Sequence, residues 1–270
     1  MTLDEATRLL AGAGVDNPRS DARLLLAHVL GISRDQTLTA TPTQTQYALF
    51  DALVARRAKR EPFAYITGRK EFWSLDFEVG PGVLIPRPDT ESLIEEALRI
   101  VPDKNARLRI ADLGAGSGAI LIAALKEFPN ATGIGFECSE TAFAYAAANA
   151  AKLIGARAQI RQTDWDQAQG PFDLVFSNPP YIPSAEIESL EPDVARYEPR
   201  AALDGGPDGL EAYRALAGLL PGLLRHGGHA LLEIGFGQES AVAPLFKSLE
   251  LVRIAPDLSG IARCVILRKP

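Results

Sequence analysis

The sequence predicts an α/β protein with a mostly parallel sheet and an antiparallel C-terminal strand, preceded by a small helical bundle and a β-hairpin. In the C-terminal two thirds, apolar strand-like runs alternate with helical patterns, as in repeated βαβ units. The N-terminal apolar residues recur only at helical spacing, and an aromatic-rich stretch follows them. We therefore expect a helical domain at residues 1–61, a β-hairpin linker at residues 62–84 and the α/β domain at residues 85–270.

Length, hydrophobic content and cysteine count limit the class of protein. With 270 residues, of which 47% are hydrophobic, the chain can bury a sizeable core without disulfides. Cys138 and Cys264 form neither a disulfide framework nor a CxxC metal motif, which favours a reducing compartment. The N-terminus lacks a targeting pattern, and no apolar run approaches the ~20 residues of a membrane span. We expect a cytoplasmic protein without metal or membrane contact.

The charge is unevenly distributed along the chain. The formal net charge is −6, and the residues up to Gly80 hold ten basic and ten acidic side chains. The whole excess of negative charge therefore lies in the predicted α/β domain. A protein that grips nucleic acid through phosphates usually has the opposite balance, so we expect no direct nucleic-acid contact.

Three helices are expected in the N-terminal domain. Thr2 and Glu5 form a capping box that opens the first helix, and the second runs from about residue 20 to Gly31. The third is expected to open at Thr41, with proline in its first turn. Its basic end is interpreted as a solvated helix terminus that comprises Arg56, Arg57, Lys59 and Arg60.

The segment after residue 62 is expected to form the hairpin and then an extended stretch. Ile85 through Glu91 contains two prolines and several charged residues before a helix capped by Asp89 or Thr90. Two interpretations stay open for this stretch. It is either a rigid linker with a helix cap, or Arg87 and its neighbours border an active site.

The α/β domain is expected to follow a regular alternation. The expected strands are residues 108–113, 132–136, 158–162, 172–177, 229–234, 251–254 and 263–267, and the expected helices are residues 119–127, 139–152, 210–224 and 238–249.

A glycine-rich stretch lies where the first strand of this domain passes into the first helix. Glycines there let the backbone turn tightly and approach a ligand, while the helix N-terminus presents free N–H groups. Glu137 ends the next strand, about 20 residues on, where an acidic side chain can bind ribose hydroxyls. This pattern indicates a nucleoside-bearing cofactor, but Gly114, Gly116 and Ala119 also satisfy the fingerprint of NAD enzymes.

Two features favour S-adenosylmethionine over NAD. Asp112 precedes the first glycine and a third glycine follows at Gly118, which makes an Asp-x-Gly-x-Gly-x-Gly pattern. Asp164 and Trp165 follow the third strand, where a carboxylate can meet the adenine amine and an indole can cover the ring. The alternative for Trp165 is a core aromatic. These patterns indicate cofactor-binding roles for Asp112, Gly114, Gly116, Gly118, Glu137, Asp164 and Trp165.

The fourth strand ends in Asn178-Pro179-Pro180-Tyr181. Each proline fixes its own φ and has no N–H, so the carbonyls of Asn178 and Pro179 are expected to stay free. The result is a cluster of acceptors beside an aromatic ring. Such a turn suits a planar group that carries an NH2.

Together these motifs resemble a class I methyltransferase with a Rossmann-like fold, and Asn-Pro-Pro-Tyr is similar to the signature of enzymes that methylate planar NH2 groups. The flanking segments resemble the HemK/PrmC family almost end to end. These segments are Tyr65-Ile66-Thr67-Gly68, Phe72-Trp73, Leu84 through Glu91, Tyr197-Glu198-Pro199-Arg200 and Leu203 through Leu210.

The resemblance implies a protein-(glutamine-N5) methyltransferase. Such an enzyme uses S-adenosylmethionine to methylate the glutamine of the Gly-Gly-Gln motif in class I peptide chain release factors, and it releases S-adenosylhomocysteine. It implies that the helical N-terminal domain binds the protein substrate. We expect the protein to be a monomer. The resemblance also implies catalytic and substrate-binding roles for Asn178, Pro179, Pro180 and Tyr181. By position, it adds Ala115, Ser117 and Asn178 to the expected cofactor-binding residues.

Some residues in these segments leave questions open. Glu137 departs mildly from the family, which often has Asp at this position, so the reach to the ribose differs. Arg87, Glu198 and Asp208 lie in family-like segments without an assigned role. Two other functions also remain: an adenine N6-methyltransferase acting on DNA or RNA, and a non-catalytic nucleotide-binding or NAD-dependent protein. The adenine methyltransferases share the Asn-Pro-Pro-Tyr motif. In a non-catalytic or NAD-dependent protein, the motif would have no function.

Overall fold

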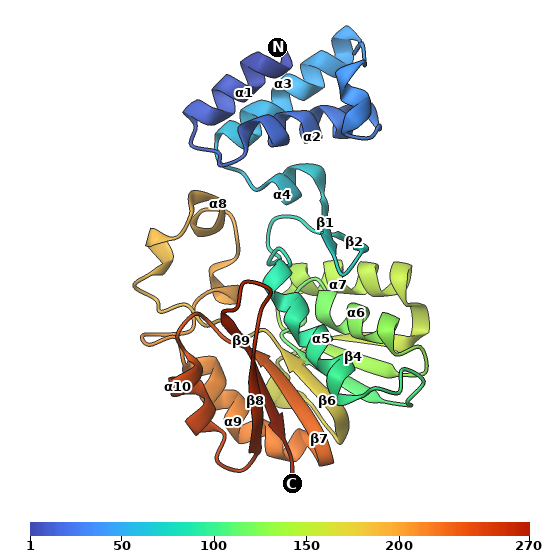
Figure 1. The fold of residues 1–270 in the computed structure, drawn as a ribbon, viewed down its shortest axis with the longest axis vertical. Coiled ribbons are helices and arrows are strands. Elements are labelled where there is room, and N and C mark those ends of the chain that lie inside the picture. Colours follow the sequence, from blue (N-terminus) through green and yellow to red (C-terminus); the bar gives the residue numbers. More distant parts are fainter. The chain divides into compact units, whose positions relative to one another are not determined.

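The structure is a computed structural model that describes residues 1–270. The chain divides into a helical unit, Met1–Arg69 with Glu191–Tyr197, and a larger α/β unit, Lys70–Leu190 with Glu198–Pro270. Figure 1 shows the elements of both units. No helix has the length and apolar character needed to cross a lipid bilayer. The role of residues 62–84 as a separate linker stays a prediction.

The helical unit forms around an apolar core. Its core includes the buried side chains of Leu10, Leu25, Phe50 and Val54. The expected three helices are confirmed, and a fourth short one follows. The bounds are α1 (Leu3–Gly12), α2 (Pro18–Leu30), α3 (Gln44–Ala58) and α4 (Phe63–Thr67).

Capping boxes open two of these helices. The expected box of Thr2 with Glu5 is present at α1. The expected start of α3 at Thr41 was wrong, because Thr43 is the cap and its hydroxyl accepts from the backbone N–H of Gln46. Gln46 in turn accepts from the N–H of Thr43 at 2.8 Å, which completes the reciprocal pair.

The expected hairpin begins later than Pro62. Residues 63–67 form α4, in which Ala64, Tyr65 and Ile66 are all buried, so burial on several sides favours a helical turn over an alternating strand. The hairpin itself consists of β1 (Arg69–Phe72) and β2 (Leu75–Glu78).

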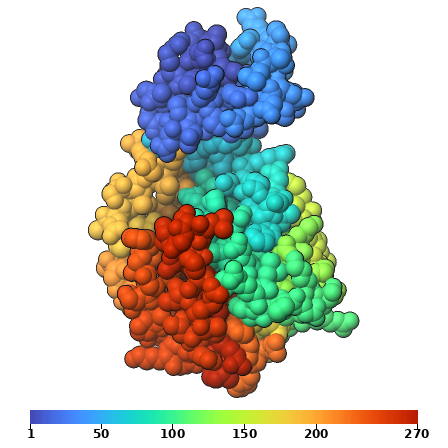
Figure 2. Space-filling view, in the orientation of Figure 1, coloured from blue at the N-terminus to red at the C-terminus, as the bar shows by residue number.

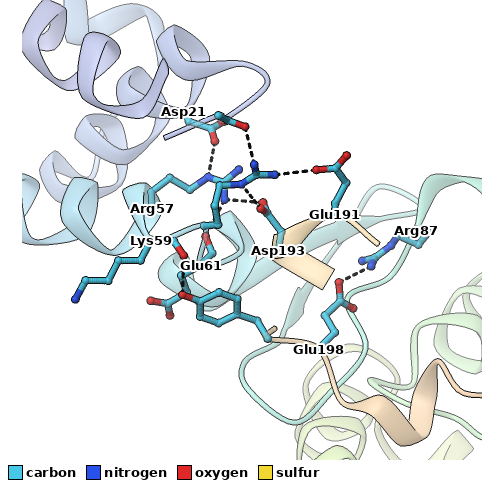
Figure 3. Close-up of polar contacts among 11 residues, drawn as sticks. Asp21, Arg57, Lys59, Glu61, Arg87, Glu191, Asp193 and Glu198 are labelled. Atoms are coloured by element: carbon cyan, nitrogen blue, oxygen red, sulfur yellow. Dashed lines mark hydrogen bonds and ion pairs between the residues drawn. The ribbon is translucent and has the colours of Figure 1, made fainter. Parts of the chain in front are cut away.

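The basic end of α3 is solvated at Arg56 and Lys59, as expected, but the interpretation was wrong for Arg57 and Arg60. Arg57 is 7% exposed and donates to Asp21 at 2.8 Å and to Asp193 at 2.6 Å. Arg60 donates to the other oxygen of Asp193 at 2.5 Å, and Tyr197 donates to the carbonyl of Lys59 (Figure 3). The segment 191–197 is therefore held within the helical unit by ion pairs.

The α/β unit contains a seven-stranded sheet in the order β5-β4-β3-β6-β7-β9-β8. All neighbours pair in parallel except those of β9, which is antiparallel to both β7 and β8. This confirms the predicted parallel sheet with an antiparallel C-terminal strand. The strands are β3 (Arg109–Leu113), β4 (Thr132–Glu137), β5 (Ala158–Gln162), β6 (Phe172–Ser177), β7 (Leu224–Glu233), β8 (Glu250–Pro256) and β9 (Ala262–Arg268).

Helices cover both faces of this sheet. On one face, α5 contacts α6 and α6 contacts α7, while α9 packs on β6 and β7 from the other (Figure 1). Figure 2 shows the C-terminal residues in red beside the green residues of α5, which contacts β8 and β9. The bounds of the covering helices are α5 (Glu91–Ile100), α6 (Ala119–Glu127), α7 (Glu140–Leu153) and α9 (Glu211–Leu223).

Two C-terminal expectations need correction. A helix over residues 238–249 was wrong: α10 covers only Glu239–Val242, and a 3-10 turn follows at Ala243–Leu245. Pro244 in that turn lacks an N–H and cannot continue the helix. The strand expected at 229–234 begins earlier, at Leu224, with a register shift in its pairing to β6.

Candidate active site

A cavity of about 280 Å³ lies at the carboxyl ends of β3, β4 and β6. The chain runs from β3 outward through β4 and β5 and then returns to β6 on the other side of β3. The carboxyl ends of β3 and β6 thus flank the switch point where open α/β sheets bind ligands. The lining residues are Gly82, Leu84, Gly114, Gly116, Phe136, Glu137, Cys138, Ser139, Ala142, Thr163, Asp164, Trp165, Asn178, Pro180, Pro199, Ala201 and Ala202.

The glycine loop after β3 forms one wall of the cavity. Gly114, Gly116 and Gly118 have φ values of 79°, 56° and 82°, which side chains other than glycine rarely adopt. A Cβ on Gly114 would lie 3.4 Å from the ring of Trp165, whereas one on Gly116 would meet no atom within 4 Å. The backbone at Gly116 is therefore open to close approach by a ligand.

Glu137 lies across from this loop and joins it by a hydrogen bond. Its Oε2 accepts from the N–H of Gly116 and its Oε1 from the N–H of Ser139, both at 2.8 Å. Burial raises the pKa of Glu137, and the two backbone N–H groups act in the opposite direction. Each oxygen keeps a further lone pair, so the carboxylate can still accept from ligand hydroxyls.

Asp112 and Ser117 make hydrogen bonds beside the glycine loop without lining the cavity. Asp112 is fully buried and does not line the cavity; its Oδ2 accepts from Leu121 N at 3.2 Å, and its Oδ1 has no partner. Burial raises its pKa to about 7. The carbonyl of Ser117 accepts from Asn149 at 3.0 Å. Ala115, Ser117 and Gly118 also lie outside the lining residues.

Asp164 and Trp165 form the third side, after β5. The Oδ1 of Asp164 accepts from the backbone N–H of Trp165 at 2.6 Å and caps a short 3-10 turn, Trp165–Gln167. Both residues line the cavity. Trp165 is also packed against the core cluster of the sheet, as expected for a core aromatic. That its indole covers an adenine ring stays a prediction.

The Asn178 turn closes the cavity at the end of β6. Asn178 and Pro180 line it, and the backbone carbonyls of Asn178 and Pro179 accept no hydrogen bond within the chain. The Nδ2 of Asn178 donates to Thr90 Oγ1 at 3.3 Å, while its Oδ1 has no partner in the chain. The turn therefore presents unused acceptors, as expected for a site that binds an NH2 group.

Tyr181 is not among the residues that line the cavity. Its hydroxyl donates to Glu233 Oε1 at 3.3 Å, and its carbonyl accepts from Gln238 at 2.9 Å. A Cβ on Gly205 or Gly209 would come within 2.8 Å and 2.4 Å of the Tyr181 backbone. The glycine-rich segment before α9 thus packs closely on this turn, whereas stacking of Tyr181 on a substrate stays a prediction.

Arg87 and Glu198 link two walls of the cavity. Glu198 is 7% exposed and accepts from the N–H of Ile85 at 3.1 Å. Arg87 donates to Glu198 (Figure 3) and, at 2.8 Å, to the carbonyl of Ile85. Leu84 and Pro199 next to these residues line the cavity. Arg87 thus borders the site through its ion pair, without lining it. Asp208 pairs with Arg214 at 2.5 Å instead.

Sequence reasoning missed several residues here. Cys138, Ser139 and Thr163 follow strand ends and could have been found from the same rule that pointed to Glu137. Leu84 and Pro199 lie in family-like segments, but their apolar side chains carry no chemical signal that would place them in the wall of a cavity. The sequence indicates Thr90 only as a helix cap, and no local pattern points to Glu233.

Comparisons with known proteins agree with this geometry. Residues 2–68 match the PrmC N-terminal domain, and residues 93–190 match the methyltransferase small domain.

Two curated relatives share most of their length with this chain. The release factor glutamine methyltransferase of Rhodospirillum rubrum is 46% identical and is matched over 99% of this chain and 84% of its own. That of Caulobacter vibrioides is 44% identical over 95% of this chain and 91% of its own.

Solved structures show the same fold at low identity. A Pyrococcus furiosus methyltransferase is similar with a TM-score of 0.53 at 17% identity, covering 80% of this chain and 98% of that one. A 16S rRNA methyltransferase of Thermus thermophilus in complex with AdoMet and guanosine gives 0.52 at 19%, covering 75% of this chain and 50% of that one. Given the identity and coverage of the curated relatives, the chain belongs to the release factor glutamine methyltransferase family.

Proposed function

We propose that this enzyme transfers a methyl group from S-adenosylmethionine to N5 of the glutamine in the Gly-Gly-Gln motif of class I release factors. The names of its relatives support the substrate. The observation that carries the chemistry is the cavity itself, because Asn178, whose Oδ1 has no partner in the chain, lines it together with the glycine loop and Glu137. The cytoplasm, where release factors act in translation, is the proposed place of the reaction.

The residues present fit the proposed cofactor. The open backbone at Gly116 admits a ligand, Glu137 has lone pairs for ribose hydroxyls, and the Trp165 indole offers an apolar face beside Asp164. We propose these residues, with Gly114 and the buried support of Asp112, as the cofactor site. When bound, S-adenosylmethionine supplies an electrophilic methyl group on a sulfonium sulfur.

The Asn178 turn supplies the substrate's orientation. An amide nitrogen is a poor nucleophile, because its lone pair is delocalised into the carbonyl. Acceptors at Asn178 Oδ1 and the Pro179 carbonyl would hold its two N–H groups and align the nitrogen for attack. Their partial negative charge also favours the positive charge that develops on the nitrogen. The chain's contribution is thus positioning and electrostatic stabilisation.

A three-substrate assay tests the substrate. The purified chain is incubated with methyl-labelled S-adenosylmethionine and either a class I release factor, its Gln→Ala version in the Gly-Gly-Gln motif, or adenine-containing DNA and RNA. We expect label on the unaltered release factor alone. Label on nucleic acid alone would instead assign the adenine N6 reaction, and label on the Gln→Ala protein would show that another residue is methylated.

Asn178→Ala tests the acceptor turn. We expect a fold indistinguishable by circular dichroism and a kcat reduced by about 100-fold or more, because a catalytic hydrogen-bonding group is lost. A kcat close to that of the unaltered enzyme would remove the turn from the mechanism.

We also propose that the helical unit contacts the release factor. Four large apolar side chains are exposed on it, namely Leu9, Leu38, Tyr47 and Leu49. Exposed apolar residues at this density on one small unit fit a protein-binding role better than a purely structural one.

A further inference from the structure

A series of hydrogen bonds connects a buried carboxylate to the amide of Asn178. Asn178 Nδ2 donates to Thr90 Oγ1 at 3.3 Å, and Thr90 Oγ1 donates to Glu233 Oε2 at 2.5 Å. The exposed fractions of Thr90 and Glu233 are 4% and 1%, so water does not compete for these bonds. Figure 1 shows β7, at whose end Glu233 lies, next to β6, which leads into Asn178.

Glu233 accepts hydrogen bonds at both its carboxylate and its backbone carbonyl. Its second oxygen, Oε1, accepts from the Tyr181 hydroxyl at 3.3 Å. Its backbone carbonyl accepts from the Tyr213 hydroxyl at 2.8 Å. Both carboxylate oxygens therefore receive a proton from a neighbour, which is the pattern of an ionised carboxylate, a group that only accepts.

The proton count then sets the direction of every bond in the series. Thr90 has one hydroxyl proton, and that proton is given to Glu233. The Thr90 oxygen can therefore only accept from Asn178, and only the NH2 end of a carboxamide can donate. The NH2 of Asn178 is thus kept on the Thr90 side, which leaves Oδ1 free for a ligand in the cavity that Asn178 lines.

We propose that Thr90 and Glu233 are positioning residues that set the orientation of the Asn178 carboxamide, so that its oxygen accepts from the NH2 group of the substrate glutamine. The identity of that substrate rests on the proposed function. The orientation of the Asn178 carboxamide does not rest on the proposed function. With the carboxamide reversed, its NH2 would face the NH2 of the substrate, and two donors cannot bond to each other.

Matched substitutions of Thr90 test the series by kinetics. Thr90→Val keeps the shape of the side chain and removes the hydroxyl, Thr90→Ser keeps the hydroxyl, and Ser92→Ala removes a neighbouring buried hydroxyl that bonds only to the carbonyl of Asp89. We expect Thr90→Val to lower kcat by about 100-fold, the cost of a misplaced reacting group, with little change in KM or cofactor Kd. Thr90→Ser and Ser92→Ala are expected to stay within about threefold of the unaltered enzyme.

Two kinetic results would overturn the proposal. One is a Thr90→Val enzyme with unaltered kcat. The other is a Thr90→Ser enzyme as slow as Thr90→Val, since that would show that side-chain volume and not the hydroxyl matters.

An NMR measurement reads the orientation without any reaction. In protein labelled with 15N-asparagine, the side-chain NH2 signals of Asn178 are assigned by their loss in Asn178→Ala. We expect their exchange with water to accelerate about fivefold in Thr90→Val, the factor expected for one lost hydrogen bond, and to be unchanged in Ser92→Ala. Unchanged exchange in Thr90→Val would refute the contact. If the enzyme methylated no release factor, the proposed function would fail while this measurement still decided the orientation.

Glu233→Gln gives an independent test at the far end of the series. Gln brings an NH2 that can donate to Thr90, which would free the Thr90 proton to point at Asn178 and reverse the carboxamide. We expect the same loss of kcat and the same faster exchange as in Thr90→Val. Unaltered kcat in a folded Glu233→Gln enzyme would exclude the carboxylate from the series.

Discussion

Asp193 and Arg57, 136 positions apart in the sequence, are joined by a hydrogen bond of 2.6 Å. Arg60 binds the second oxygen of the same carboxylate, so one aspartate is shared by two arginines of the helical unit (Figure 3). The segment 191–197 belongs to the helical unit although the residues on either side of it belong to the α/β unit. The chain therefore returns to the helical unit between the Asn178 turn and Glu198.

Asp193→Asn tests the stabilising effect of this ion pair. The substitution keeps the size of the side chain but leaves the buried Arg57 with Asp21 as its one remaining carboxylate partner. We expect the free energy of unfolding to fall by about 2 kcal/mol, less than for a fully buried pair because Asp193 is 21% exposed. Urea unfolding followed by far-ultraviolet circular dichroism measures the change.

Glu191→Gln is the matched control. Glu191 also pairs with Arg60, at 3.0 Å, but its side chain is 70% exposed. An exposed pair contributes little, so we expect a change below about 0.5 kcal/mol. Equal effects of the two substitutions would show that burial does not distinguish them and that Asp193 has no special role.

The activity is expected to depend on the ionisation of Glu233. Burial raises its pKa from 4.5 to about 7, while hydrogen bonds from Thr90 and Tyr181 and the charge of Arg263 lower it and Asp89 raises it. Because the Asn178 orientation requires the ionised form, kcat should increase as the pH rises through about 7.

The contribution of Glu233 to the free energy of unfolding is expected to change with pH in the direction opposite to kcat. A carboxyl whose pKa is higher in the folded state favours folding while it is protonated. Its contribution is complete below 4.5 and is lost as the pH rises to about 7. The charge that orients the site is thus expected to cost stability.

Measuring kcat from about pH 5.5 to about 8.5 tests whether Glu233 is the group whose ionisation controls the activity. The inflection near 7 should vanish in Glu233→Gln. Asp112 is also buried with a pKa of about 7, so Asp112→Asn serves as the comparison and should retain the inflection. An inflection lost only in Asp112→Asn would assign the pH dependence to the glycine loop.

The parts of the site with local signals could be predicted from the sequence. The glycines after β3 and the prolines after β6 interrupt apolar strands, and parallel strands place their carboxyl ends at one edge. That is why Gly114, Glu137 and Asn178 lie at a single cavity in the structure.

Contacts between distant parts of the chain gave no such signal. Thr90 and Glu233 are 143 positions apart, and the packing of α5, which follows Thr90, against β7 brings them together. Arg57 and Arg60 looked like a solvated helix end because their partner Asp193 follows more than 130 residues later. Pairing across such distances depends on tertiary packing, which the local pattern does not contain.

Glu137→Gln is expected to weaken cofactor binding. The substitution replaces one acceptor oxygen by an NH2 that cannot accept from either Gly116 N or a ligand hydroxyl. We expect the Kd for S-adenosylmethionine to rise about tenfold, the equivalent of ~1.4 kcal/mol, in isothermal titration calorimetry.

Glu140→Gln makes the same change of charge at an exposed position in the first turn of α7. Its Kd should match that of the unaltered enzyme. If both substitutions weakened binding equally, the effect would come from the general charge of this region and not from the Glu137 contact.

The role of the helical unit can be tested on its exposed apolar residues. Leu38 and Leu49 are 69% and 50% exposed, so the double substitution to Glu should not disturb the core. If they contact the release factor, its KM should rise about tenfold while saturating kcat and cofactor Kd stay constant, because only binding common to ground state and transition state is lost. Leu251→Glu, at an exposed position of β8 in the α/β unit, is the control. A KM that changed for Leu251→Glu and not for the double variant would move the contact surface to the α/β unit.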